Sequence, residues 1–167
     1  MNTKAFAPRK SYGWVFLALI VFPFFLLGGF FAQLYLATEN AVLLIFIFLF
    51  LAIAIPFLVI LASLPSMRYE LDDEKLVMKC GFLKYVVPLT SVKRITKRDL
   101  EITLWSSLRL PGLALFTVLY ADVGRVKMCA TSMSKGIILI HTNGDVYGVT
   151  PLEEEAFIAD LRRRIGD

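Results

Sequence analysis

Few side chains in this sequence are of the kinds that catalyse reactions or hold metal ions. His141 is the single histidine, and it lies on a predicted strand with no cysteine or acidic residue beside it. A metal site, or a histidine paired with a serine or cysteine nucleophile, would depend on that one ring. The spacings GxxxxGK[ST], GxGxxG and HExxH do not occur. We therefore give His141 a structural role and expect a protein that is not an enzyme, without catalytic residues, cofactor or metal ion.

The remaining reactive residue types also have simple structural explanations. Cys80 and Cys129 are too few and too far apart for a disulfide framework or a CxxC metal site. Because free cysteines are usually buried, we expect both to be reduced thiols in a core. The acidic run Asp72-Asp73-Glu74 could chelate a hard cation, but a polar hairpin turn is the commoner role of such a run.

One basic cluster allows two interpretations. Lys93, Arg94, Lys97 and Arg98 follow one another closely, within thirty residues of an apolar run. They could bind anionic lipid, at about 1 kcal/mol per basic residue near the surface. They could equally form a solvated strand face balanced by Asp99 and Glu101, which is the interpretation we favour.

Composition indicates the elements that must carry these residues. The chain is 57% hydrophobic and only 19% charged, far from the average of a soluble domain. Residues 14–37 and 41–64 form two apolar runs of about 24 residues, each long enough to cross a bilayer as a helix. Within them only Tyr35 is ionisable, and only residues 38–40 separate them. The sequence therefore predicts a transmembrane helical hairpin over residues 14–64.

The charged residues indicate how the hairpin is oriented. Residues 1–13 form a basic tail, and the turn between the spans contains Glu39 and no basic residue. The positive-inside rule then places both termini in the cytoplasm, with the protein in the cytoplasmic (inner) membrane. Beyond the hairpin, fifteen basic and thirteen acidic residues nearly balance. This balance is unlike that of a nucleic-acid-binding domain, so the expected partners are the lipid bilayer and protein.

Residues 66–167 are expected to form one small cytoplasmic domain. Short alternating segments separated by turns predict strands, among them residues 125–130 and 136–142, and Asn143-Gly144 predicts a hairpin turn. Residues 92–102 are ambiguous between strand and helix, and we favour strand. Thr150-Pro151-Leu152-Glu153 predicts the start of an amphipathic helix that Gly166 ends.

The order of these elements resembles a known family. Residues 69–95, YELDDEKLVMKCGFLKYVVPLTSVKRI, resemble the opening of bacterial pleckstrin-homology-like (PH-like) domains. Residues 124–161 are similar to the closing strand, hairpin and helix of that superfamily. The resemblance implies an antiparallel β-barrel closed by the C-terminal helix, attached to the membrane hairpin. It does not imply phosphoinositide binding, because the loop that would be basic in such domains contains Asp72, Asp73 and Glu74.

Two functions fit these expectations. The first is a membrane-anchored scaffold that binds a protein partner or a second copy of itself through exposed strand edges and an apolar segment. Residues 105–120 fit the family pattern least and are unusually apolar, so the candidate contact residues are Leu110, Leu113, Leu115 and Phe116. The alternative is a sensor of anionic lipid headgroups that uses the four basic residues 93, 94, 97 and 98.

Overall fold

The computed structural model describes residues 3–103 and 109–166, which divide into two compact units. One unit is residues 14–64, and the other combines residues 1–13 with residues 65–167. The two segments that flank the apolar region therefore fold together. The segment that we expected to be a basic tail is part of this second unit.

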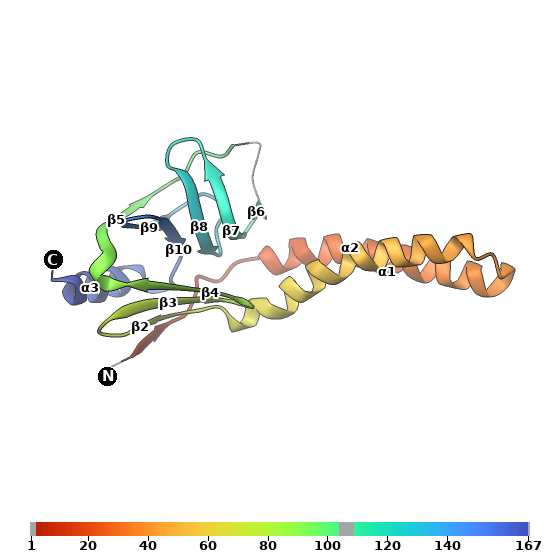
Figure 1. Cartoon of the computed structure of the whole chain (residues 1–167), viewed down its shortest axis with the longest axis horizontal. Helices are drawn as coiled ribbons and strands as arrows, with labels where there is room; N and C mark the ends of the chain where they lie inside the picture. The colour runs from red at the N-terminus through yellow and green to blue at the C-terminus, as the bar shows by residue number, and fades with distance from the viewer. Residues whose placement is uncertain (1–2, 104–108, 167) are drawn as a thin grey trace. The chain divides into compact units, whose positions relative to one another are not determined.

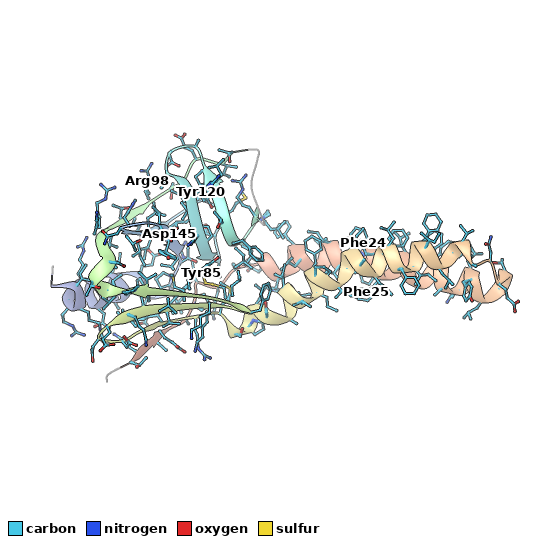
Figure 2. The ribbon with its side chains drawn as sticks, in the orientation of Figure 1. Phe24, Phe25, Tyr85, Arg98, Tyr120 and Asp145 are labelled. Atoms are coloured by element: carbon cyan, nitrogen blue, oxygen red, sulfur yellow. A yellow bond between two sulfur atoms is a disulfide. The ribbon has the colours of Figure 1, made fainter. Side chains whose placement is uncertain are left out.

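The apolar unit consists of two antiparallel helices, α1 (Gly13–Thr38) and α2 (Val42–Ser63). Phenylalanine rings pack between them, with Phe31 stacked on Phe46 at a centroid distance of 5.1 Å and on Phe50 at 5.6 Å. α2 begins at Val42 with Ala41 at the N-cap position. In the turn before it, the Asn40 side-chain oxygen accepts a hydrogen bond from the Val42 amide at 3.1 Å. Apolar side chains project outward along both helices (Figure 2). The short 3-10 helix η1 (Leu64–Ser66) follows.

The first sheet of the other unit is antiparallel, in the order β1-β2-β3-β4 (Figure 1). Its strands are β1 (Lys4–Phe6), β2 (Arg68–Leu71), β3 (Lys75–Cys80) and β4 (Leu83–Pro88). The acidic run 72–74 forms the turn between β2 and β3, as expected. Asp72 accepts hydrogen bonds from the amides of Glu74 and Lys75, at 2.9 and 2.7 Å.

The second sheet has six strands in the order β5-β9-β10-β8-β7-β6, and η2 (Leu89–Ser91) connects it to the first sheet. The strands are β5 (Val92–Arg98), β6 (Arg109–Leu110), β7 (Leu113–Tyr120), β8 (Gly124–Ala130), β9 (Ile137–Thr142) and β10 (Val146–Val149). The β9–β10 hairpin turns at the predicted Asn143-Gly144. Its return strand then pairs in parallel with β8.

This arrangement differs from the predicted antiparallel barrel. Within the described ranges the strands form two sheets, and one pairing, β8 with β10, is parallel. The alternating patterns of β8, β9 and β10 are visible in the sequence, but the order of these strands in the sheet depends on tertiary packing. Gly148 illustrates the close approach of these strands: a Cβ atom there would lie 2.4 Å from the Met128 sulfur, so a larger residue would require the Met128 side chain to move.

The last element is α3 (Glu154–Ile165), an amphipathic helix whose Phe157 and Leu161 are fully buried. Gly166 ends it in the left-handed conformation, as expected. The predicted cap at its start is wrong: Glu153 occupies the N-cap position, without a side-chain hydrogen bond. The Thr150 hydroxyl is used elsewhere, because it accepts a hydrogen bond from the Thr131 amide at 2.8 Å.

Candidate functional site

The four basic candidates all lie on β5, an edge strand that pairs only with β9 in the described sheet. All four side chains are exposed, and two are engaged by acidic residues. Lys97 forms an ion pair with Glu154, and Arg98 forms one with Asp122. The expected partners were Asp99 and Glu101. Asp99 instead accepts a hydrogen bond from the Gly136 amide at 2.6 Å.

His141 lies opposite Arg94 in the β5–β9 ladder. Its ring nitrogen Nε2 is 3.2 Å from the Thr96 hydroxyl. Partial burial lowers the pKa of His141, and the positive charges of Arg94 and Arg98 lower it further. The ring is therefore neutral near pH 7, and its neighbours are a hydroxyl and cations. Across residues 3–103 and 109–166, no group of three or more His, Cys, Asp or Glu side chains is placed to hold a metal ion.

The apolar candidates are separated by the fold. Leu113 and Leu115 are each only 1% exposed, so the expectation that they form a contact surface is corrected: they belong to the core. Leu110 and Phe116 are half-buried. The residues of this segment at 105–108 lie outside the described residues.

Phe116 has an unusual backbone conformation for a bulky residue in the middle of a strand. Its φ angle is +66°, in the left-handed region that such side chains rarely adopt. A conformation of this kind costs of order 1–3 kcal/mol and persists only where its surroundings impose it. The Phe116 ring packs against Phe82 in the β3–β4 turn, at a centroid distance of 6.1 Å. Phe82 is 56% exposed, so the two rings form an aromatic pair that reaches the surface.

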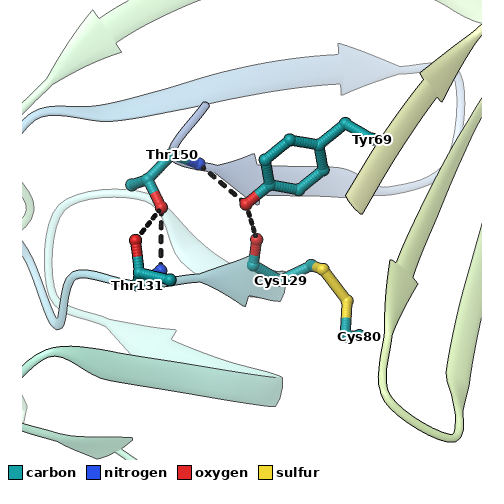
Figure 3. Close-up of a disulfide and its surroundings, with 5 residues drawn as sticks. All are labelled: Tyr69, Cys80, Cys129, Thr131 and Thr150. Carbon is teal, nitrogen blue, oxygen red and sulfur yellow. Dashed lines mark hydrogen bonds between the residues drawn. A yellow bond between two sulfur atoms is a disulfide. The ribbon is translucent and has the colours of Figure 1, made fainter. Parts of the chain in front are cut away.

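A second cluster, which the sequence did not indicate, joins the two sheets (Figure 3). The buried Tyr69 hydroxyl donates to the carbonyl of Cys129 at 2.7 Å and accepts from the Thr150 amide at 3.3 Å. Burial raises the pKa of Tyr69 to about 12. Beside it, Cys80 of β3 and Cys129 of β8 form a disulfide, with Cα atoms 5.8 Å apart. The expectation of two reduced thiols is therefore corrected. Spacing in the sequence could not reveal that β3 and β8 face each other.

The N-terminal segment forms a third cluster, also missed by the sequence analysis. Residues 4–6 pair with β2, and the Arg9 amide donates to the Thr150 carbonyl at 2.7 Å. Phe6 is buried against Phe157 of α3, with ring centroids 5.2 Å apart in an edge-to-face arrangement. The strand is only three residues long, too short to show a period of two, so composition alone made it look like a tail.

Surface hollows add little to these clusters. One of about 540 Å³ lies between the β2–β3 turn, η2 and the end of α3. Asp73 and Arg164, which line it, form an ion pair with each other at 2.5 Å. Opposite charges in this hollow thus compensate one another, so it does not present the single sign of charge that would attract a charged ligand.

Comparison with known proteins identifies the domain. The family model of the bacterial PH domain matches residues 67–165, more than half of the 167-residue chain, and confirms the resemblance seen in the sequence. No curated protein and no solved structure matches the chain significantly. PH-like domains are generally non-catalytic binding modules, and no enzyme family is indicated. With two long apolar helices followed by a mostly β domain that matches over 99 residues, this chain belongs to the bacterial PH domain family.

Proposed function

We propose that this protein is a membrane-anchored, non-catalytic scaffold. In this proposal α1 and α2 cross the cytoplasmic membrane, and the PH-like domain binds a protein partner or a second copy of the chain in the cytoplasm. Both helices are long and apolar enough to span a membrane, a criterion of length and composition that some core helices and signal sequences also meet. Only 17% of the most apolar window of each helix is buried within the chain, whereas a soluble core helix is mostly buried.

One observation carries the proposal of an anchored domain. Residues 1–13 and 65–167 fold as a single unit, with residues 4–6 paired to β2. The two ends of the apolar region must then emerge on the same side of a membrane. Two membrane spans bring the chain back to the side on which it started, whereas a single span leaves the two flanking segments on opposite sides.

The proposed side is the cytoplasm, by the positive-inside rule. Lys10 before α1 and Arg68 after α2 support it, together with Lys4 and Arg9. The disulfide favours the opposite side, because such bonds persist mainly in oxidising compartments. Cys80 and Cys129 are both buried, which limits the access of cytoplasmic reductants. Cysteine labelling from outside intact cells distinguishes the two sides.

The proposed contact surface is the aromatic pair of Phe82 and Phe116, with Leu110 on the strand before β7. Exposed aromatic rings are typical anchors of protein interfaces. Phe82 lies in the β3–β4 turn and Phe116 lies on β7, so the pair draws one ring from each sheet.

The test is purification of the tagged full-length protein in mild detergent, with mass spectrometry of the complex. Phe116→Asn removes the ring while keeping a residue that tolerates positive φ. We expect it to lose the co-purifying chain, or the second copy, without a lower melting temperature. Leu119→Asn, at an exposed position of the same strand, is the matched control. A wild-type protein that purifies as a bare monomer would contradict the scaffold proposal.

A second candidate function is the binding of anionic lipid headgroups by the basic residues of β5. The observation that favours it is the exposure of Lys93 and Arg94 on the edge strand β5. Burial lowers the pKa of His141 beside them, and the positive charges of Arg94 and Arg98 lower it further. Native mass spectrometry of the full-length protein with added phosphatidylglycerol or phosphatidylcholine tests it. Lys93→Glu with Arg94→Glu should remove the preference for the anionic lipid, and Lys84→Glu with Lys135→Glu should not. An unchanged preference would rule out this site.

A further inference from the structure

We propose that the groove between the edge of β2 and the start of α3 is a binding site for an extended peptide, occupied at rest by residues 3–10 of the same chain. We call these residues the arm. The inference deepens the scaffold proposal, on which it rests for its biological use, by naming a site and the chemistry of the segment that fits it.

Backbone pairing along the arm is that of strand addition. Lys4, Ala5 and Phe6 pair in antiparallel register with Leu71, Glu70 and Tyr69. The next residues of the arm pair with the segment that precedes α3 instead of with β2. There the Leu152 amide donates to the Ala7 carbonyl at 2.8 Å, and Pro8 forms a β-bridge with Pro151. A peptide that adds to a sheet edge gains affinity from such bonds whatever its sequence.

An aromatic pocket supplies the first element of specificity. The Phe6 ring is 3% exposed and packs edge-to-face with Phe157, whose ring centroid lies 6.1 Å from that of Tyr69. Because side chains in a strand alternate, Lys4 and Phe6 lie on the same face of β1. The pocket therefore selects a large apolar residue with a basic residue two positions before it.

Two carboxylates supply the second element of specificity, by selecting basic residues in the bound segment. Glu154 forms ion pairs with Arg9 of the arm and with Lys97 of β5. Asp160, only 5% exposed, lies 3.8 Å from the Lys4 ammonium and forms ion pairs with Arg163 and Arg164. The matching segment therefore has the pattern basic-x-aromatic-x-x-basic, as in Lys4, Phe6 and Arg9.

The arm fills the site imperfectly at its first position. Among the described residues the Asp160 Oδ2 atom accepts no hydrogen bond, because the nitrogens of Lys4 and Arg164 near it are both 3.8 Å away. A hollow of about 270 Å³ lies beside it, lined by Lys4, Ala156, Ala159, Asp160 and Arg163. There is room for a longer donor, so a segment with arginine in place of Lys4 should bind more tightly than the arm itself.

The arm is suited to displacement. It lies outside the matched family region 67–165, and Lys4 and Ala5 are exposed. It is held by three ladder pairs, one buried ring, the backbone bonds at Ala7 and Arg9, and the Arg9–Glu154 ion pair, and it has the high effective concentration of a segment on the same chain. A partner segment competes with this intramolecular occupant.

The experiment measures binding of a fluorescent peptide of residues 3–10, TKAFAPRK, to the full-length protein in mild detergent. Phe6→Glu should release the arm, because it places a charge in the aromatic pocket. We expect Phe6→Glu to bind the peptide at least about tenfold more tightly than wild type, because no intramolecular competitor remains. The same peptide with Glu in place of Phe is the ligand control and should not bind. A peptide with Arg at the first basic position should bind more tightly, and Asp160→Asn should remove that gain.

A second variant covers the outcome in which Phe6→Glu fails to fold. A protease site placed between Lys10 and Ser11 cuts the arm from the otherwise intact protein, and the labelled peptide should then exchange into the groove. A folded Phe6→Glu protein or cleaved protein that binds TKAFAPRK no better than the control peptide would overturn the proposal, as would equal binding to wild type. The synthetic peptide makes this result independent of whether a partner co-purifies, so the two proposals can fail separately.

Discussion

Tyr69 connects the two sheets at the scale of a single residue. Its hydroxyl bonds the Cys129 carbonyl and the Thr150 amide, both far from it in the sequence. Tyr69→Phe leaves these two backbone groups without their partner, and an unsatisfied buried group costs about 1–3 kcal/mol. We expect the free energy of unfolding to fall by about that amount, measured by chemical denaturation of the full-length protein in detergent. Tyr12→Phe, at a side chain that is 78% exposed, should leave it unchanged. Equal stability of Tyr69→Phe and wild type would contradict the assigned role.

The β2–β3 hairpin shows how one element depends on the charge of its turn. Burial of Asp72 opposes its ionisation, but the Glu74 and Lys75 amides and the charges of Lys75 and Arg164 outweigh that effect, so its pKa is lowered from 3.8. A carboxyl with a lowered pKa in the folded state stabilises the fold above its unfolded pKa, and this contribution is lost as the pH falls through the folded value. We therefore expect wild-type stability to decline below about pH 4. Asp72→Asn keeps the side-chain oxygen but cannot titrate.

The matching measurement is urea unfolding of both proteins between pH 3 and pH 6. The stability difference between wild type and Asp72→Asn should be largest at the upper end and should shrink as the pH falls. A difference that stays constant over this range would show that the charge of Asp72 does not stabilise the turn.

The disulfide acts at the scale of the whole domain, because Cys80 and Cys129 belong to different sheets and are separated by 49 residues in the sequence. Removing such a crosslink typically costs about 2–5 kcal/mol. We expect dithiothreitol to lower the unfolding midpoint of the full-length wild-type protein. The double variant Cys80→Ser with Cys129→Ser should not respond to the reductant. Two free thiols in unreduced, denatured protein would contradict the bond.

Membrane topology is the second property of the whole molecule. In the cysteine-free double variant, new cysteines replace Lys10, Asn40 or Lys84, one at a time, and an impermeant maleimide is added to intact cells. The cytoplasmic orientation predicts labelling at Asn40, and at Lys10 and Lys84 only after permeabilisation. Labelling of Lys10 and Lys84 from outside would reverse the orientation, and labelling of only one of them would exclude two spans.

The sequence by itself determined the features that depend on neighbouring residues. Two uninterrupted apolar runs can only be long apolar helices, Asn143-Gly144 can form the tight hairpin turn, and Gly166 can adopt the left-handed conformation that ends α3. Turn residues and apolar positions over residues 69–95 and 124–161 were also enough to identify the bacterial PH family. These signals are local, so they can be recognised in the sequence without knowledge of the fold.

Only the tertiary structure decided which distant segments meet. It placed β10 in parallel beside β8, joined Cys80 to Cys129, buried Leu113 and Leu115, and paired the arm with β2. None of these contacts has a local signature, because each is stabilised by burial and hydrogen bonds between groups more than fifteen residues apart or from different sheets. The candidate site changed for the same reason: an apolar run identifies residues that avoid water, and only packing decides whether the core or a partner covers them.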